Sequence, residues 1–297
     1  MKIAHLSDPH LLDLHGVPWR TLMSSKRITG AANLLVARAR KHRAPIAQQL
    51  ARHIHESHVD HVVITGDVTN LSLDPEFALV ARWLREDLAL DPERVSLVPG
   101  NHDRYTRDAA RSEAFERMLG PYLAGDLPSS SHFPYVRLRG PVAILGVDSA
   151  VPRPPLVAAG EVGRDQLERL RELLDDPEVR QRTPLILVHH PPRWTRSWCK
   201  EMTDGLRDAA ALQAILPQRP GLLLHGHMHR TMVHSLHAGR SRWEVVGAPS
   251  ASSTSTAGDR AAGYNTYVFD DEGRLVEKLS TTRGADGSLR TSELRSG

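Results

Sequence analysis

Short apolar runs recur along the chain, and each is followed at once by polar or turn-forming residues. The runs are continuous and rich in β-branched residues, which is typical of strands buried on both faces. They cover residues 3–6, 62–65, 95–98, 142–147, 185–188 and 222–224. Apolar residues at helical spacing lie between several of them, over residues 44–58, 75–87, 164–175 and 208–216. Strands that alternate with helices predict a layered α/β domain.

The C-terminal part of the chain has a different pattern, in which strands follow one another without intervening helices. We expect strands over residues 243–246, 264–269 and 275–279, with a hairpin turn at Asp270-Asp271-Glu272-Gly273 between the last two. From residue 283 the chain is rich in Gly, Ser, Arg and Glu, so residues 283–297 are expected to form a flexible tail. No internal repeat or linker divides residues 1–282, which we interpret as one domain.

The composition adds one clue. Of the 297 residues, 40% are hydrophobic and 25% charged, as in ordinary globular proteins, and the single cysteine excludes an intrachain disulfide. We find no signal peptide and no apolar stretch of about 18 residues, so we expect a cytoplasmic protein without a membrane span. The formal net charge of +3 is too small to indicate a nucleic-acid partner. The clue is the 17 histidines, because neutral imidazole is the commonest metal ligand.

The candidate chemistry lies at the ends of the predicted strands. The runs lead into segments that carry Asp, His or Asn, namely Ser7-Asp8-Pro9-His10, Gly66-Asp67, Gly100-Asn101-His102-Asp103, His189-His190-Pro191-Pro192 and His225-Gly226-His227-Met228-His229. Glycines beside the ligands allow the loops to turn sharply and approach a metal closely. The carboxyl ends of strands in open α/β sheets are where ligands bind. We therefore expect these segments to meet at one edge of the structure.

The residue types at these positions suit a pair of divalent cations. Asp8 and His10 can chelate one ion, and the two oxygens of Asp67 can bridge two ions. Asn101 offers a neutral carbonyl oxygen. Imidazoles are supplied by His189, His227 and His229. Nitrogen and oxygen ligands without thiolate indicate iron, manganese or zinc.

Taken in order, these segments resemble the signature of the calcineurin-like metallophosphoesterase superfamily: Asp-x-His, Gly-Asp, Gly-Asn-His-Asp/Glu, His and Gly-His-x-His. The resemblance implies a four-layer α/β/β/α sandwich with two mixed β-sheets flanked by helices. It implies a first metal ion held by Asp8, His10, Asp67 and His229. It implies a second ion held by Asp67, Asn101, His189 and His227, with His189 rather than His190 as the ligand. One departure from the pattern is Asn70, where many relatives carry an aspartate.

The resemblance also implies a mechanism, in which a metal-bound hydroxide attacks phosphorus. His102 is expected to contact the phosphate and protonate the leaving group, and Asp103 to orient the imidazole of His102. Within the superfamily, the Ser-Asp-Pro-His and His-His-Pro-Pro segments are most similar to bacterial class III cyclic-nucleotide phosphodiesterases. We therefore predict hydrolysis of small phosphodiesters, with cyclic nucleotides as candidate substrates.

A second feature is the basic segment, residues 20–52, in which Arg and Lys alternate with apolar residues and which contains no acidic residue. We interpret it as a solvated helical insertion that covers the site, or as an amphipathic surface for acidic lipid headgroups or a polyanionic substrate. The second interpretation allows peripheral membrane contact. It also provides an alternative function, hydrolysis of a lipid-linked pyrophosphate or phosphodiester at the inner membrane surface. A phosphomonoesterase and an oligomeric assembly also remain open, whereas the complete ligand set argues against an inactive scaffold.

Overall fold

The computed structural model describes residues 1–18, 42–154, 156–192, 197–256 and 258–294. Most of the basic segment, residues 20–41, lies outside this part of the chain. The helices are α3 (Ala44–Glu56), α4 (Asp74–Trp83), α5 (Arg107–Arg111), α6 (Ala114–Leu119), α7 (Arg164–Asp175), α8 (Pro177–Arg180), α9 (Trp198–Asp204) and α10 (Ala209–Ile215). A π-helical turn, η2 (Leu84–Leu88), continues α4, and short 3₁₀ turns are η3 (Pro92–Arg94), η4 (Gly120–Tyr122) and η5 (Gly258–Arg260).

The strands form two sheets of six strands each. They are β1 (Lys2–Leu6), β2 (His61–Thr65), β3 (Val95–Val98), β4 (Tyr135–Arg139), β5 (Val142–Gly146), β6 (Thr183–Leu187), β7 (Gly221–His225), β8 (Met232–Ala238), β9 (Ser241–Gly247), β10 (Gly263–Phe269), β11 (Leu275–Arg283) and β12 (Leu289–Glu293). The first sheet has the order β12-β11-β10-β1-β2-β3 and the second β4-β5-β6-β7-β9-β8. The central strands pair in parallel, and β10, β11, β12, β4 and β8 add antiparallel pairs. The predicted mixed sheets are confirmed.

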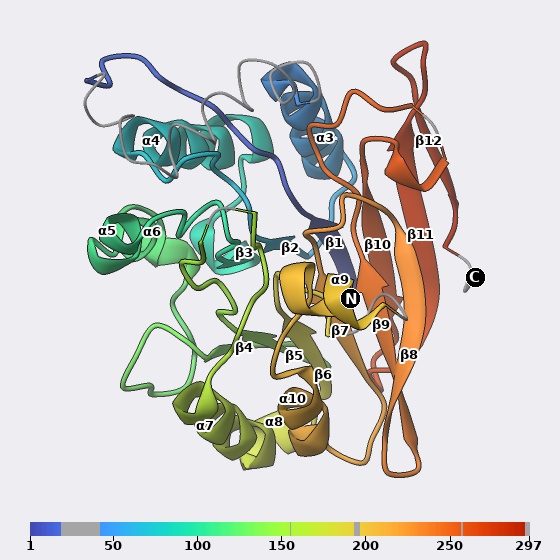
Figure 1. The fold of residues 1–297 in the computed structure, drawn as a ribbon. Coiled ribbons are helices and arrows are strands. Elements are labelled where there is room, and N and C mark those ends of the chain that lie inside the picture. The colour runs from blue at the N-terminus through green and yellow to red at the C-terminus, as the bar shows by residue number, and fades with distance from the viewer. Residues whose placement is uncertain (19–41, 155, 193–196, 257, 295–297) are drawn as a thin grey trace.

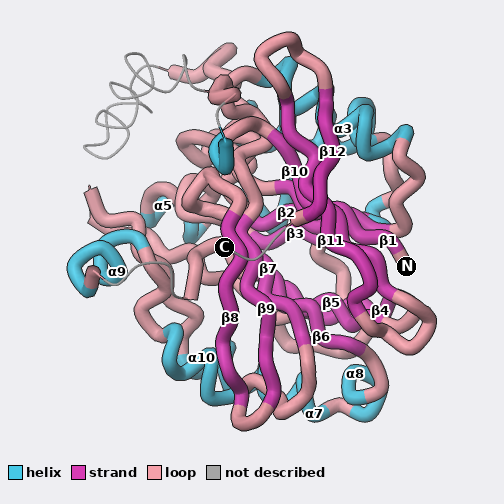
Figure 2. The backbone as a smooth tube through the Cα atoms, turned by 90° about the vertical axis from the view of Figure 1, so that its right-hand side faces the viewer, coloured by secondary structure: helices cyan, strands magenta, loops and turns pink. Residues whose placement is uncertain are grey.

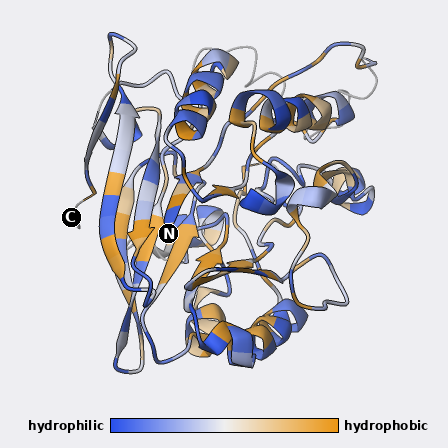
Figure 3. Ribbon diagram, turned by 180° about the vertical axis from the view of Figure 1, so that it is seen from behind, coloured by the Kyte–Doolittle hydropathy of each residue, from blue (hydrophilic) through white to orange (hydrophobic). Residues whose placement is uncertain are grey.

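The two sheets lie between two groups of helices (Figure 1). Helices α3, α4, α5 and α6 flank the first sheet, and α7, α8 and α10 flank the second. Seen from the side, strands β8 to β12 lie in front, and the helices lie toward the edges of the view (Figure 2). Apolar residues gather on the strands and inner helix faces, whereas the outer helix faces are polar (Figure 3). This is the flanked two-sheet architecture that the sequence predicted.

Strand β5 shows how one sheet serves two cores. Ile144 packs in the cluster that joins both sheets, together with Ile64 of β2. The next residue along, Leu145, points the other way and packs with Leu170 and Leu174 of α7. This alternation follows from the two-residue period of a strand, and burial of each Leu or Ile side chain contributes about 1.5–3 kcal/mol. Both faces of the strand are therefore apolar, which explains its continuous hydrophobic sequence.

Helix α3 covers the first sheet at the end of the basic segment. Its buried residues are Ile46, Ala47, Leu50, Ala51 and Ile54. On the exposed side, Arg52 donates to Asp87 Oδ1 from both Nε and Nη2, at 3.0 and 2.9 Å. The described end of the segment is therefore an amphipathic helix whose apolar face packs on the protein. No helix among the described residues has the length and apolar character needed to cross a membrane.

The expectation of a flexible tail over residues 283–297 is wrong for most of this range. Strand β11 extends to Arg283, and β12 pairs with it antiparallel, with Arg283 opposite Leu289. The side chain of Leu294 is buried. A strand on a sheet edge satisfies its backbone hydrogen bonds by pairing with its neighbour, so it needs few apolar side chains of its own. Composition therefore underestimated the order in this part of the chain.

Candidate metal centre

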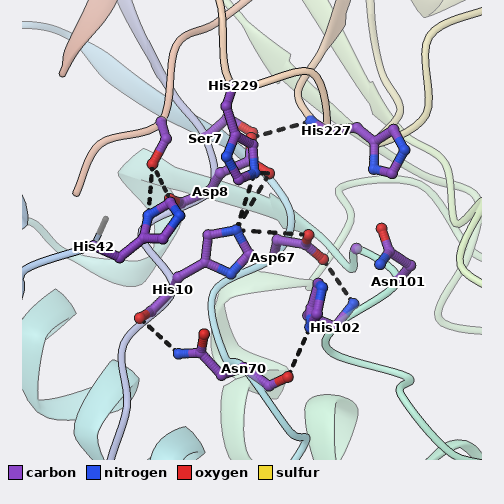
Figure 4. Close-up of polar contacts among 12 residues, drawn as sticks. Ser7, Asp8, His10, His42, Asp67, Asn70, Asn101, His102, His227 and His229 are labelled. Carbon is purple, nitrogen blue, oxygen red and sulfur yellow. Dashed lines mark hydrogen bonds and ion pairs between the residues drawn. The ribbon is translucent and has the colours of Figure 1, made fainter. Parts of the chain in front are cut away.

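All seven predicted metal ligands lie together beyond the carboxyl ends of the parallel strands (Figure 4). Asp8 and His10 follow β1, Asp67 follows β2, and Asn101 follows β3. The three imidazoles of His189, His227 and His229 follow β6 and β7 of the second sheet. Each sheet therefore supplies part of the site.

The first predicted donor set is a compact group of four side chains. One ligand atom each from Asp8, His10, Asp67 and His229 lies within 4.8 Å of the others. Nε2 of His229 lies 3.2 Å from Asp8 Oδ1 and 3.1 Å from Nε2 of His10. Nε2 of His10 lies 3.9 Å from Asp67 Oδ2. Atoms at these separations can share one ion.

The second predicted donor set adjoins the first through Asp67. Nε2 of His189 lies 3.4 Å from Asp67 Oδ2 and 3.1 Å from Asn101 Oδ1. The ring of His227 is 5.1 Å from that of His189. Asp67 Oδ2 is thus close to an imidazole of each donor set, as a carboxylate shared by two ions must be.

Backbone carbonyls orient two of the imidazoles. Nδ1 of His189 donates to Thr65 O at 2.6 Å, and Nδ1 of His10 donates to Thr69 O at 3.4 Å. In the neutral ring these bonds place the proton on Nδ1 and leave the lone pair on Nε2, the atom that faces the carboxylates. Such a bond to a ligand histidine fixes its tautomer and ring orientation.

Several of these residues have a left-handed backbone. Positive φ occurs at Asp8 (51°), His10 (43°), Asp67 (52°), His227 (68°) and His229 (51°). This conformation costs a non-glycine residue on the order of 1–3 kcal/mol and is concentrated at functional sites. The surrounding structure compensates, because Asp8 N donates to Gly66 O at 3.0 Å and His10 N donates to Asp67 O at 3.1 Å. Loops after β1 and β2 therefore hold each other in the conformation that turns the side chains inward.

Two glycines allow the loops to approach each other. A Cβ built on Gly66, which has φ of +86°, would lie 2.6 Å from Gly100 N and 2.7 Å from His189 Nδ1. A Cβ on Gly100 would overlap the carboxylate of Asp67. No real Cβ tolerates such distances, so a larger residue would push the bridging carboxylate away. Glycine is therefore needed for the close approach of the loops to each other, and the predicted approach to a metal stays a prediction.

The electrostatics of the site fit positive ions. Burial acts to raise the pKa of Asp67, but the imidazoles of His189 and His102 hold that pKa well below its usual value. Burial likewise acts to lower the pKa of His189, but the Asp67 carboxylate outweighs it and raises that pKa to about 9. Burial also acts to raise the pKa of Asp8, but His229, whose Nε2 lies 3.2 Å from Asp8 Oδ1, lowers that pKa below its usual value. Buried carboxylates that attract positive charge, with oxygen and nitrogen donors around them, are suited to divalent cations.

His102 lies beside the first donor set. Its ring is 5.2 Å from that of His10 and stacks on Tyr105 at 5.1 Å. Its Nδ1 donates to Asn70 O at 2.7 Å, and its backbone N donates to Asp67 Oδ1 at 2.7 Å. The residue is therefore held by the loop that carries the shared carboxylate.

The expected role of Asp103 is wrong. Its carboxylate does not hold the His102 ring, whose Nδ1 is bonded to Asn70 O. Instead it accepts from Thr69 N and Oγ1 at 2.8 and 2.9 Å, Gly100 N at 2.9 Å and Val68 N at 3.2 Å. A side chain that follows a strand end can turn back to the adjacent loop, and unpaired amides there attract a buried carboxylate. Asp103 therefore ties the β2 and β3 loops together.

Two further histidines lie against the site. His190 is buried next to His189 and His227, at ring distances of 4.9 and 4.8 Å, and its Nδ1 bonds Ser149 Oγ at 2.8 Å. It was expected to be a neighbour of the ligands, which its position confirms. His42 was not singled out in the sequence, because it follows no strand and belongs to the end of the basic segment.

Comparison with solved structures identifies the fold. The chain is similar to a dimetal phosphatase from Danio rerio, with 15% identity, a TM-score of 0.57 and 99% of each chain covered. It is also similar to purple acid phosphatase PPD1 from yellow lupin (Lupinus luteus) seeds, with 11% identity and a TM-score of 0.59, covering 98% of this chain and 52% of that one. Identities this low show a shared fold alone. Comparison with curated proteins finds no match.

A family-level match goes further than these structures. The sequence pattern of the family described as calcineurin-like phosphoesterase matches residues 1–231, which is more than half of the chain. The matched range contains every predicted metal ligand, from Asp8 to His229. The protein therefore belongs to the calcineurin-like phosphoesterase family.

Proposed function

We propose that this protein is a two-metal phosphodiesterase that hydrolyses small phosphodiesters. The observation that carries the proposal is the position of Asp67. Its Oδ2 lies 3.9 Å from Nε2 of His10 in one donor set and 3.4 Å from Nε2 of His189 in the other. Membership of the calcineurin-like phosphoesterase family supports hydrolysis of a phosphate ester bond.

The candidate metal centre has four side chains that could bind each of two ions. Asp8, His10, Asp67 and His229 would hold the first. Asp67, Asn101, His189 and His227 would hold the second. When bound, such an ion pair lowers the pKa of a water near it and neutralises charge on phosphate oxygens. Mixed nitrogen and oxygen donors suit manganese, iron or zinc.

His102 is proposed to contact the substrate phosphate and to donate a proton to the leaving oxygen. Asn70 O holds Nδ1 of the ring, so Nε2 is the nitrogen left to face the reacting groups. The ring packs between His10 and Tyr105, which restricts its rotation. A fixed donor near the leaving group contributes about 10²–10⁴ to the rate.

The preference for diesters and the candidate cyclic-nucleotide substrates are supported by sequence alone. The Ser-Asp-Pro-His and His-His-Pro-Pro segments resemble those of bacterial class III cyclic-nucleotide phosphodiesterases. These segments contain the predicted ligands Asp8, His10 and His189, so they lie at the candidate metal centre. A small phosphodiester is therefore the substrate class that we propose.

A partly apolar pocket near the site favours a second candidate, a lipid-linked pyrophosphate or phosphodiester. The pocket has a volume of about 410 Å³, and its lining is mixed: the apolar residues are Val17, Pro18, Leu73, Pro75 and Ala109, and the polar ones are Ser72, Asp74, Asp108 and Ser112. Oγ of Ser72 donates to His102 O at 2.6 Å, so the pocket begins next to the proposed proton donor. An apolar group attached to the phosphate could lie there. Peripheral membrane contact through residues 20–52 stays a prediction on which this alternative depends.

A substrate panel tests the proposal. Purified protein loaded with manganese would be offered bis-p-nitrophenyl phosphate, p-nitrophenyl phosphate, cyclic AMP, 2′,3′-cyclic AMP, a glycerophosphodiester and a lipid pyrophosphate. We expect the highest kcat/KM on a small diester. Preference for the monoester or for the lipid substrate would contradict the diesterase assignment, and no turnover of any ester would contradict the function itself.

Matched variants locate the activity. We expect Asn101→Ala to abolish turnover on the best substrate. The control is Asp91→Asn, at an exposed position before η3, which should keep wild-type rates. Substantial turnover in Asn101→Ala would place the site elsewhere.

A further inference from the structure

His42 lies against the first donor set although it belongs to a different part of the chain (Figure 4). It precedes α3, at the end of the basic segment. Its ring centroid is 4.6 Å from that of His10 and 5.2 Å from that of His229, with a perpendicular arrangement in the second case. A third imidazole therefore adjoins two predicted ligands of the same ion.

The ring nitrogens of these histidines can act together. One nitrogen each from His10, His42 and His229 lies within 4.8 Å of the others. Nitrogens that bind one transition metal at about 2.1 Å are separated by at most about 4.2 Å. A small rotation of the His42 ring is therefore enough to bring its nitrogen to the ion that His10 and His229 hold.

Two serine hydroxyls lie within hydrogen-bond distance of Nδ1 of His42. Ser250 Oγ donates its hydrogen to Asp8 O at 2.7 Å, so it can only accept from His42 Nδ1 at 3.3 Å. Ser252 Oγ lies 2.9 Å from the same Nδ1 and 3.5 Å from Asp8 O. Both hydroxyls can therefore accept from Nδ1–H and pass their own hydrogens to the backbone of Asp8. In this network Nδ1 is protonated and Nε2 carries the lone pair.

This arrangement is the one that metal-ligating histidines adopt. In a ligand histidine, the N–H of the second ring nitrogen donates a hydrogen bond to an oxygen, which fixes the tautomer and aims the lone pair of the other nitrogen at the metal. His42 shares this feature with His10 and His189, whose Nδ1 atoms donate to backbone carbonyls. The acceptors of His42 are in turn bonded to Asp8, so the network joins it to a predicted ligand.

We propose that His42 is an additional imidazole ligand of the first cation, beside His10 and His229. The proposal rests on the metal centre of the proposed function, but the activity can be real without it. A third imidazole shifts this site toward nitrogen donors, which favours zinc, iron or cobalt over magnesium or manganese. It also ties a residue of the basic segment directly to the metal centre.

The first test measures metal affinity without turnover. Zinc binding to chelator-treated protein would be followed by competition with a chromophoric chelator for wild type, His42→Ala and His42→Phe. We expect both variants to bind the ion of the first donor set about 10–100-fold less tightly, whichever of the two sites binds zinc more tightly. The control is His132→Ala, at an exposed position, which should bind as wild type does. Thermal unfolding of the metal-free proteins identifies a variant that fails to fold, and unchanged affinity in a folded variant would overturn the proposal.

The second test asks whether His42 binds the metal directly. In cobalt-loaded protein, the ring N–H of a coordinated histidine gives a proton resonance shifted far outside the normal range. We expect the wild type to show one such signal that is missing from His42→Phe and present in His132→Ala. We also expect Ser252→Ala, which removes an acceptor of that N–H, to broaden the signal by faster exchange with water. An unchanged set of shifted signals in His42→Phe would overturn the ligand assignment even if affinity fell.

The ligand role of His42 and the proposed phosphodiesterase function can be disproved independently. If wild-type protein hydrolyses diesters and the His42 variants keep both affinity and cobalt signals, only the additional ligand is wrong. If no phosphate ester is hydrolysed while His42→Phe loses affinity and one signal, the ligand assignment stands and the proposed function is wrong.

Discussion

The backbone oxygen of Asn70 accepts a hydrogen bond at 2.7 Å from Nδ1 of His102, so the loop after β2 sets the direction of a side chain that follows β3. The side chain of the same residue contacts the loop after β1, because Nδ2 of Asn70 donates to His10 O at 2.7 Å. Asn70 thus connects the proposed proton donor with the first donor set. An aspartate, as many relatives carry here, lacks the Nδ2 hydrogen that makes the second bond.

Replacement of His102 should separate chemistry from metal binding. We expect His102→Ala to lower kcat by about 10²–10⁴ on a diester with an alcohol leaving group. The loss should be much smaller on bis-p-nitrophenyl phosphate, because the acidic phenol leaves without a proton. Steady-state kinetics on both substrates, with metal content measured in parallel, check this. Equal losses on both substrates would mean that His102 does not protonate the leaving group.

Removal of the Asp103 carboxylate should destabilise the fold. Asp103→Ala leaves the buried amides of Val68, Thr69 and Gly100 without their acceptor, and each such loss costs about 1–3 kcal/mol. We expect the free energy of unfolding, measured in urea, to fall by about 3 kcal/mol or more. The control is Asp91→Ala, at an exposed position. Equal stability of the two variants would contradict the role of Asp103 as a tie between loops.

A methyl group at Gly100 should disrupt the shared carboxylate. The added carbon would lie 2.8 Å from Asp67 Cγ, so Asp67 must move. We expect Gly100→Ala to lose about 10²-fold or more in kcat/KM, together with metal affinity. Gly120→Ala is the matched control, because its Cβ would meet no atom within 4 Å and its φ of −46° suits alanine. Wild-type activity in Gly100→Ala would contradict the conclusion that the loops leave no room for a Cβ at this position.

Metal removal should lower both activity and stability. Without cations, the buried carboxylates of Asp8 and Asp67 lie close together and repel each other. An ion at about 100 times its Kd stabilises the folded state by about 2.7 kcal/mol. We therefore expect EDTA to abolish hydrolysis and lower Tm by several degrees, and manganese to restore both. An unchanged Tm and rate in EDTA would contradict a metal centre.

Glu76 should make the stability of the metal-free protein fall with rising pH. Burial raises the pKa of this carboxyl from 4.5 to about 8, although the amides of Leu71, Leu73 and Asn70 donate to it. The folded state then holds a proton that the unfolded state releases between these pH values, so stability is lost across that window. The slope attributable to one group is about 1.4 kcal/mol per pH unit.

Glu76→Gln isolates this contribution. We expect the variant to have a flatter dependence of unfolding free energy on pH between about 5 and 8, measured by urea denaturation in EDTA. Because glutamine resembles the protonated carboxyl and does not ionise, the two curves should lie closest together below about pH 4.5 and diverge as the pH rises. Parallel curves across the whole window would show that Glu76 keeps an ordinary pKa.

Much of the fold followed from local pattern. The apolar runs at residues 3–6, 62–65, 95–98 and 185–188 are the cores of β1, β2, β3 and β6. Helix α7 matches its predicted range, because Leu167, Leu170 and Leu174 recur at helical spacing and pack against the second sheet. These elements bury their own side chains, so their sequences carry the signal. Strand β12 buries few of its side chains, so its sequence carries no such signal, and only its pairing with β11 identifies it.

The candidate ligands were also visible along the chain, because each follows a strand and parallel strands deliver their carboxyl ends to one edge. What only the tertiary structure decided is how the side chains are held. Asp103 bonds backbone amides instead of the neighbouring imidazole, and His42 approaches His10 from a segment that shows no strand. Hydrogen bonds between residues far apart in sequence depend on how separate loops are placed in space. A periodic pattern records which residues are buried, and it contains no information on which of them meet.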